Sequence, residues 1–284
     1  MNWIDEGALY AQINLFLRED LGRGDITTQS IVARNTRARA RFVAGENMIV
    51  AGLEAAEEVF LTLDSQQQLE AFVSDGEPVE AGKVIARMVG FADVLISAER
   101  VALNLLQHLS GIATLTNNYV KAVEGTGAQI TDTRATTPGL RPLERYAVEL
   151  GGGYNNRFGL DDGVVVTSNH ISILGSVAGA VTSAKEKLGY LHKVAVEVAS
   201  ENDIREAIKA GADVVVIEDL DSKEFARLVG VAREFSKSVA IECAGKITPA
   251  NVREYAEAGA QQIRVEALTN AAPAANISFK VQPF

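Results

Sequence analysis

The sequence predicts an α/β protein, with a mixed α+β unit up to about residue 114 and a TIM-like barrel after it. Three observations favour this fold class. Apolar strand-like runs recur along the second part of the chain, at 128–131, 164–166, 194–198, 214–217, 239–242 and 263–265. Helical stretches separate most of these runs, at 202–210, 223–234 and 251–258. No Gly-x-Gly-x-x-Gly follows a strand, which disfavours a dinucleotide-binding sheet.

The alternation of strands and helices indicates how the second part is built. Strands that are apolar throughout and alternate with helices are typical of a parallel sheet whose two faces are covered. The helices tend to finish in small-residue turns, such as Ala-Gly-Ala at 210–212. Six such strands, with room for one more, favour a barrel over an open sheet.

The first part of the chain combines helices with short strands. Apolar residues from Leu9 to Leu21 recur at helical spacing and predict an amphipathic helix over 8–22. A strand-rich segment over 38–51, a helix over 53–63, a meander of short strands over 69–89 and a helix over 97–110 follow. The tail, 276–281, has strand character and is expected to return to this first unit.

Composition excludes several classes of protein. The 284 residues are 47% hydrophobic and 23% charged, as in an ordinary globular protein. A net charge of −10 argues against non-specific binding to nucleic acid or to an anionic membrane, although a local arginine cluster could still hold an anion. A single cysteine, Cys243, allows no internal disulfide. The first residues do not have the pattern of a signal peptide and no apolar run is long enough to span a membrane, so we expect a cytoplasmic protein.

The stretch 130–171 contains the strongest functional signal. Asp132 and Arg134 follow the first apolar run of the barrel, and Arg157 lies in a glycine-rich connection to the next run. Thr167, Ser168, Asn169 and His170 then follow that second run. Parallel α/β folds bind ligands at the carboxyl ends of their strands, and the planar guanidinium fork suits carboxylate or phosphate. The stretch therefore predicts an anion site.

Further charged and polar residues stand where the barrel strands are expected to end. The set is Asp132, Arg134, Thr167, Asn169, His170, Glu197, Glu218, Asp219, Glu242, Lys246, Arg264 and Glu266. An unpaired charge is costly to desolvate, so some of these residues must pair with each other. Arg264 with Glu242 or Glu266 is a plausible structural pair.

Structural explanations compete with functional ones at several positions. His170 could cap a helix that starts at Ile171, since Asn and Ser precede it. Three scattered histidines and the absence of a spaced carboxylate pair disfavour a metal site built from protein side chains alone. Neither a Ser-His-Asp nor a Cys-His arrangement is legible, and Cys243 in an apolar strand is expected to be a core residue.

Several long strings of residues resemble one known family, the quinolinate phosphoribosyltransferases. They are EDLGRGDITT near the start, AERVALNLLQHLSGIAT at 98–114, DTRATTPGLR at 132–141, YAVELGGGYNNRFGL at 146–160 and NHI at 169–171. The resemblance runs nearly end to end. It implies an N-terminal α/β sandwich over 1–114, joined by the tail 271–284, and a seven-stranded barrel over 115–270 that carries the active site. It also implies a homodimer in which Arg100 reaches the partner's active site.

The family reaction joins quinolinate to phosphoribosyl pyrophosphate with Mg²⁺, and it releases pyrophosphate and carbon dioxide to give nicotinate mononucleotide. By resemblance, Arg100, Arg134 and Arg157 hold the pyridine dicarboxylate, and the acid Glu197 is present too. Thr133, Asn169 and His170 lie in matching motifs and are expected to contribute to the same site.

Other positions depart from the family pattern. Ala135 stands where a lysine is expected, Asn156 where a histidine is expected, Thr167-Ser168 for Lys-Asp, Glu218 for aspartate, Ala244-Gly245-Lys246 for Ser-Gly-Gly, and Glu266 for glycine. We interpret this set as a dicarboxylate clamp that is retained beside a phosphoribosyl pyrophosphate half that is rewritten. A glutamate beside a polyphosphate adds like-charge repulsion.

Three functions remain open at this point. The first is the family reaction with altered contacts, in which Glu197 and Glu218 hold Mg²⁺ or ribose hydroxyls and Lys246 faces phosphate. The second is a retuned enzyme that carries out decarboxylation, condensation or transfer on another small carboxylate without phosphoribosyl pyrophosphate. The third is a binding protein without catalysis. Fold alone does not choose among them.

Overall fold

The computed structural model describes residues 5–284. The chain divides into two compact units, of which the first contains the residues up to Asn117, Thr136–Gly152 and Leu268–Phe284. The second contains Asn118–Ala135 and Gly153–Ala267. Among residues 5–284, no helix combines the length and apolar character needed to cross a bilayer.

Residues 136–152 lie in the first unit, whereas the sequence-based division assigned them to the barrel. The reason is the packing of α5, Arg141–Leu150. The hydroxyl of Tyr146 donates to Asp75 Oδ2 at 3.0 Å. A Cβ on Gly151, which follows the helix, would lie 2.4 Å from the carbonyl oxygen of Ala113 in the long helix α4. These contacts attach α5 to the first unit.

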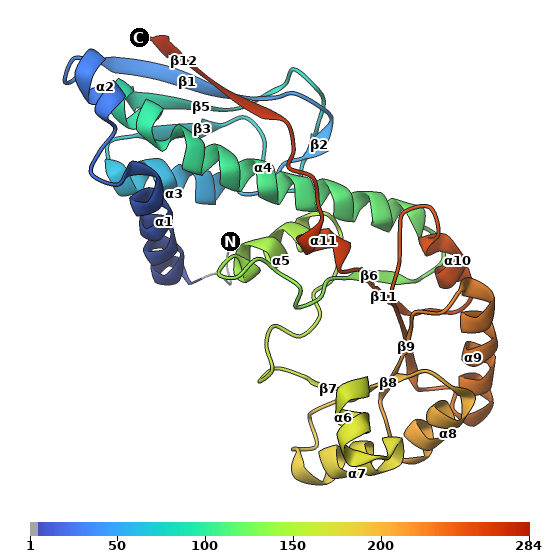
Figure 1. Cartoon of the computed structure of the whole chain (residues 1–284). Coiled ribbons are helices and arrows are strands. Elements are labelled where there is room, and N and C mark those ends of the chain that lie inside the picture. Colours follow the sequence, from blue (N-terminus) through green and yellow to red (C-terminus); the bar gives the residue numbers. More distant parts are fainter. Residues whose placement is uncertain (1–4) are drawn as a thin grey trace. The chain divides into compact units, whose positions relative to one another are not determined.

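The first unit is an antiparallel sheet with helices packed on one face (Figure 1). Its elements are α1 Glu6–Leu21, α2 Ile26–Ile31, β1 Arg37–Ala44, β2 Met48–Ile49, α3 Leu53–Leu63, β3 Gln68–Ala71, β4 Pro78–Val79, β5 Val84–Phe91, α4 Ala92–Ala122, α5, α11 Ala267–Asn270 and β12 Ile277–Pro283. The main sheet has the order β12-β1-β5-β3, and β2 pairs separately with β4. This is the α/β sandwich expected from the resemblance.

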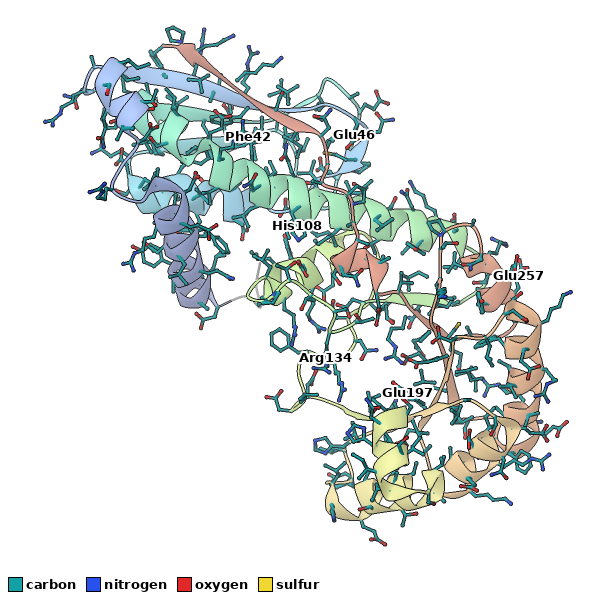
Figure 2. All side chains as sticks on the ribbon, viewed as in Figure 1. Phe42, Glu46, His108, Arg134, Glu197 and Glu257 are labelled. Carbon is teal, nitrogen blue, oxygen red and sulfur yellow. The ribbon has the colours of Figure 1, made fainter. Side chains whose placement is uncertain are left out.

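Alternation along β1 creates the core of the first unit. Ala38, Ala40 and Phe42 are buried, while the arginines between them are exposed. Phe42 packs edge-on against Phe60 of α3 and in a tilted arrangement against Phe279 of β12, with ring centroids 6.2 and 4.7 Å apart (Figure 2 labels Phe42). The tail of the chain is therefore part of this core.

Helix α4 passes through a glycine where the tail lies against it. A Cβ on Gly111 would come within 2.1 Å of the carbonyl oxygen of Pro273. Glycine is a poor helix former, yet here it permits the close approach of two backbones. The backbone N–H of Ala275 donates to the carbonyl of Gln107 one turn earlier in α4, at 2.9 Å.

Asp75 caps a helix that begins without a capping side chain of its own. Gly52, at the start of α3, has a φ of 101° and no side chain. The carboxylate of Asp75 accepts from the backbone N–H groups of Gly52 and Leu53, at 3.0 and 3.1 Å, as well as from Tyr146. Burial raises the pKa of Asp75 above its ordinary value of 3.8, and these donors oppose the rise.

The raised pKa gives a pH-dependent stability. The folded state binds the Asp75 proton more tightly than the unfolded state, so this contribution is full below pH 3.8 and is lost as pH rises through the folded pKa. An Asp75→Asn variant cannot titrate there. We expect its urea midpoint, relative to that of the natural chain, to rise between about pH 4 and pH 7. A difference in urea midpoint between the two proteins that stays constant over this pH range would contradict the raised pKa of Asp75.

The second unit is a parallel sheet covered by helices. Its elements are β6 Gln129–Thr131, β7 Val164–Val166, α6 Ser168–Leu174, α7 Val177–Lys187, β8 Val194–Val198, α8 Glu201–Lys209, β9 Val214–Glu218, α9 Ser222–Phe235, β10 Ala240–Ala244, α10 Val252–Glu257 and β11 Gln262–Arg264. The strands pair in the order β6-β11-β10-β9-β8-β7, and neighbouring strands run parallel. Figure 1 shows α8, α9 and α10 along the same side of these strands. The predicted TIM-like α/β architecture is confirmed.

The resemblance implied seven strands, and residues 5–284 contribute six to this sheet. The place of the seventh is taken by a single parallel bridge between Thr131 and Tyr154. Tyr154 N donates to the carbonyl of Ile130 at 2.8 Å, and Asp132 N donates to the carbonyl of Tyr154 at 3.1 Å. Three glycines precede Tyr154, and the weak strand propensity of glycine accounts for the shortness of this pairing.

Candidate functional site

The strand register places charged side chains on one face of the parallel sheet. Glu197 pairs with Val216, and Val216 pairs with Glu242, which in turn pairs with Gln262. Side chains alternate between faces, so Glu218 and Arg264, two residues further along their strands, share this face. Glu197, Glu218 and Arg264 stand at or next to the carboxyl ends of β8, β9 and β11.

Arg264 bridges two of the acids. Its Nε lies 2.6 Å from Oε1 of Glu242, and its Nη2 lies 3.4 Å from Oε1 of Glu218. The first contact is an ion pair by distance, while the Nε–H group itself makes no hydrogen bond. The side chains of Glu242 and Arg264 are only 11% and 16% exposed, so little solvent screens the pair. The sequence left Glu242 and Glu266 as alternative partners, and the structure selects Glu242.

The acids of this face influence one another. Burial raises the pKa of Glu242, and the charge of Arg264 opposes that rise. Burial likewise raises the pKa of Glu218, and the negative charge of Glu197 raises it further. The positive charge of Arg264 opposes both effects. The guanidinium of Arg264 thus opposes the rise in the pKa of both carboxyl groups.

Three arginines gather in the same region. Burial lowers the pKa of Arg157, and the positive charges of Arg134 and Arg264 lower it further. Nη1 of Arg157 donates to the carbonyl of Gly163 at 2.8 Å. Figure 2 shows Arg134 and Glu197 in the same part of the second unit. Like charges collected in this way favour an anionic ligand that relieves their repulsion.

Asp132 positions the segment that carries Arg157. Its side chain is fully buried, and Oδ1 accepts from the backbone N–H of Asn156 at 2.6 Å. The amide oxygen of Asn156 in turn accepts from Arg157 N at 2.7 Å. The sequence identified Asp132 as a strand-end residue but not its role in holding this loop. The signal was a carboxylate directly after a buried strand and before a glycine-rich connection.

The backbone segments that follow β9 and β10 approach each other closely. Asp219 has a φ of 55°, which is uncommon for a residue with a side chain, and its N–H donates to the carbonyl of Ala244 at 3.2 Å. Gly245, with a φ of 120°, approaches so closely that a Cβ would lie 2.9 Å from Asp219 N. Sparsely populated backbone conformations cluster at functional sites.

Helix α6 begins beside Glu197. The backbone N–H of Ser168 donates to Glu197 Oε2 at 2.8 Å. His170 folds back onto the start of its own helix, where Nδ1 accepts from Thr167 N at 3.0 Å. This geometry supports the structural role expected for His170, a residue that caps a helix. The helix starts at Ser168 and not at Ile171, and His170 contacts Thr167 at its N-terminus.

The remaining predicted site residues are spread over both units. Thr133 is buried, and its hydroxyl accepts from Ala135 N at 2.9 Å. Ala244 is buried at the end of β10. Asn169, Lys246 and Glu266 are exposed. Arg100 lies on α4 in the first unit, with a side chain that is 70% exposed and 3.9 Å from Glu99.

A separate open cavity of about 540 Å³ lies in the first unit. It is lined by Phe16, Glu19, Asp20, Val101, Asn104, Leu105, His108, Thr137 and Leu140. At its wall, Nε2 of His108 lies 2.8 Å from Oε1 of the fully buried Glu144, whose Oε2 accepts from Thr137 N at 3.0 Å. None of the strand-end residues of the sheet lines it.

Comparison with known proteins gives consistent matches along the chain. The family model for the N-terminal domain of quinolinate phosphoribosyl transferase matches residues 25–110, and the model for its C-terminal domain matches residues 112–280. A probable carboxylating nicotinate-nucleotide pyrophosphorylase of Synechocystis is 38% identical over 94% of this chain and 90% of its own length. The protein of the same description from Bacillus subtilis is 39% identical over 95% and 92%.

Solved structures match equally well. The nicotinate-nucleotide pyrophosphorylase of Francisella tularensis superposes with a TM-score of 0.92 at 35% identity, covering 99% of this chain and 98% of that one. NadC from Streptococcus pyogenes superposes with a TM-score of 0.92 at 31% identity, covering 99% of both chains. Both units are included in these matches.

Proposed function

Because this chain belongs to the quinolinate phosphoribosyltransferase family, a family of pentosyltransferases, we propose that it makes nicotinate mononucleotide from quinolinate and phosphoribosyl pyrophosphate. The ring nitrogen of quinolinate bonds to the anomeric carbon of ribose as pyrophosphate leaves. The carboxylate next to that nitrogen then leaves as carbon dioxide, and a proton from solvent takes its place on the ring carbon. One observation carries the proposal: the positive charges of Arg134 and Arg264 both act on Arg157, beside the strand ends of the parallel sheet.

The chain's own residues supply orientation and charge. Arg134 and Arg157 bind the two carboxylates of quinolinate, because planar guanidinium groups match carboxylates with two parallel hydrogen bonds. Glu197 and Glu218 accept hydrogen bonds from ribose hydroxyls, and Lys246 faces the phosphate oxygens. Thr133, Asn169 and His170 line the same site. Holding the two reactants in line removes much of the entropic barrier, and fixed positive charge stabilises the departing pyrophosphate.

The comparisons support this reaction over the alternatives. The relatives and structures named above are described as nicotinate-nucleotide pyrophosphorylases or as NadC. They give no support to a retuned enzyme or to a binding protein without catalysis. They also give no sign that the phosphoribosyl pyrophosphate contacts are replaced, so they do not support the interpretation of Ala135, Asn156 and Glu266 as a rewritten half of the site.

A product assay tests the proposed reaction. Purified protein with quinolinate and phosphoribosyl pyrophosphate should release nicotinate mononucleotide, pyrophosphate and carbon dioxide in equal amounts. The same assay with nicotinate in place of quinolinate should give no carbon dioxide. Binding of quinolinate by calorimetry without any of the three products would overturn the proposed reaction while leaving the carboxylate site intact.

The proposed assembly is a homodimer that completes its active sites by exchanging Arg100. This arginine is well exposed on α4, and among residues 5–284 its ion-pair contact is to its neighbour Glu99 at 3.9 Å, so its charge is available to a second chain. In a symmetric dimer, each protomer gives Arg100 to its partner and receives one in return.

Mixed dimers provide a test of this exchange. Arg100→Ala and Arg157→Ala dimers should each be inactive, but co-expressed chains should regain about one quarter of the natural activity. Half of randomly formed dimers are mixed, and in each of those one of the two sites contains both arginines. Co-expression of two differently tagged Arg157→Ala chains is the matched control. Purified mixed dimers without activity would exclude the exchange.

A further inference from the structure

Arg264 occupies the centre of the acidic face of the second unit. Register places its side chain diagonally across from Glu242, and Glu218 lies on the strand beyond. The guanidinium contacts both carboxylates, at 2.6 and 3.4 Å, from a largely buried position. The guanidinium of Arg264, on β11, thus connects this strand to β10 through Glu242 and to β9 through Glu218.

The acids around Arg264 do not suit a protein-bound divalent cation. The family reaction uses Mg²⁺, and Mg²⁺ prefers carboxylate oxygens in near-octahedral geometry. Within residues 5–284, no group of three His, Cys, Asp or Glu side chains has the arrangement to hold a metal ion. Glu218 and Glu242 pair with Arg264, and Glu197 accepts from Ser168 N. A divalent cation among them would also be repelled by the guanidinium.

We propose that Arg264 is a built-in cation that replaces the divalent metal ion of this acidic face. As a positioning residue, it holds Glu218 and Glu242 at the strand ends and neutralises them, so that an anionic phosphoribosyl donor is bound without Mg²⁺. This inference rests on the proposed function for the identity of the donor. The claim about Arg264 and the acids stands on the ion pairs themselves.

Mn²⁺ binding followed by electron paramagnetic resonance tests the claim without any turnover. Mn²⁺ shares the oxygen preference of Mg²⁺ and has a spectrum that is lost on binding. The natural protein should bind Mn²⁺ weakly, and Arg264→Gln should bind it at least about tenfold more tightly. A unit positive charge a few ångströms away, at the effective dielectric of a protein, opposes a cation by more than that factor.

The control is another arginine that is paired with an acid but does not contact the acids of this face. Arg253 lies on α10, about half exposed, with its Nε 2.8 Å from Glu257. Arg253→Gln removes the same charge and should leave Mn²⁺ affinity unchanged. Should Arg264→Gln fail to fold by circular dichroism, Arg264→Lys takes its place. Lysine cannot bridge two carboxylates as a planar fork does but keeps the positive charge, so a gain smaller than that of Arg264→Gln is expected.

Metal removal supplies the second readout. The rate of quinolinate phosphoribosylation by the natural protein should change less than about twofold when a chelator removes Mg²⁺, because the charge that Mg²⁺ supplies is already fixed in the site. Tight Mn²⁺ binding by the natural protein, with no gain in either Arg264 variant, would overturn the inference. Failure of the proposed function would appear differently, as absence of nicotinate mononucleotide with or without Mg²⁺, and the Mn²⁺ titrations would still decide the role of Arg264.

Discussion

Replacing Arg157 by alanine is expected to weaken quinolinate binding by at least about 100-fold. Charge-assisted hydrogen bonds are worth about 1.5–3 kcal/mol each, and a guanidinium makes two of them to one carboxylate. A loss of about 3 kcal/mol corresponds to roughly two powers of ten in the dissociation constant. Calorimetric titration of quinolinate into the natural and substituted proteins measures the difference directly.

The same substitution should leave the stability of the protein nearly unchanged. Burial and the charges of Arg134 and Arg264 lower the pKa of Arg157, which means that the folded protein without ligand disfavours this charge. Removing the charge relieves that repulsion and offsets the lost hydrogen bond to the carbonyl of Gly163. A loss of binding without a loss of stability is the signature of a ligand-binding group rather than a structural one.

Asp132 provides matched variants for this experiment. Asp132→Ala removes the acceptor for Asn156 N and should also weaken binding, since the segment carrying Arg157 is no longer held. Asp132→Asn keeps an oxygen that can accept the same hydrogen bond and should retain most of the affinity. Arg253→Ala, at an exposed position, controls for the loss of one positive charge. Quinolinate bound equally well by Arg157→Ala and by the natural protein would show that the carboxylate lies elsewhere.

Much of the second unit could be predicted because its apolar strands alternate regularly with helices. The strand at 194–198 has the same bounds in the sequence pattern and in the structure, and those at 164–166 and 214–217 agree to within a residue. Each is an apolar run, interrupted only by Glu197 in the strand at 194–198, and each is followed by a helix, so local pattern and tertiary environment agree. The helix expected over 97–110 is instead the longer α4, Ala92–Ala122. It continues through Gly111, because the backbone of the tail packs where a side chain would stand.

The parts that escaped prediction depend on register. The sequence offered Glu242 or Glu266 as the partner of Arg264. Glu242 is chosen because it pairs with Gln262, which places Arg264 two residues along on the same face. Glu266 lies beyond the end of β11 and is exposed. The loop held by Asp132 escaped for the same reason, since contacts across the chain decide it and no local pattern encodes them.

Breaking the Glu242–Arg264 pair is the second large effect that we expect. Glu242→Ala should destabilise the fold by about 3 kcal/mol, because removal of one partner leaves a largely buried charge without compensation. Both side chains are less than one fifth exposed, so solvent cannot replace the lost partner. Urea unfolding monitored by circular dichroism measures the loss.

A double-mutant cycle separates the pair from the contribution of each residue. Glu242→Leu with Arg264→Leu should be clearly more stable than the sum of the two single losses predicts, since a buried ion pair is often matched by apolar side chains of similar size. The exposed pair of Arg253 and Glu257, with side chains 52% and 59% exposed, is the matched reference. Its coupling should stay below about 0.5 kcal/mol, because solvent screens it.

The double-mutant cycle measures how strongly Arg264 is coupled to Glu242, and the Mn²⁺ titrations measure how strongly the same guanidinium opposes metal binding. If the coupling is large and Arg264→Gln gains Mn²⁺ affinity, the same charge both stabilises the acids and excludes the metal. Strong coupling in a pair this buried indicates that both side chains are charged and compensate each other, because an uncompensated buried charge is costly. A coupling no larger than that of the exposed pair would mean that Glu242 is neutral in the folded protein. Arg264 would then pair with Glu218 alone. The proposal that Arg264 neutralises both acids in place of a divalent cation would be contradicted.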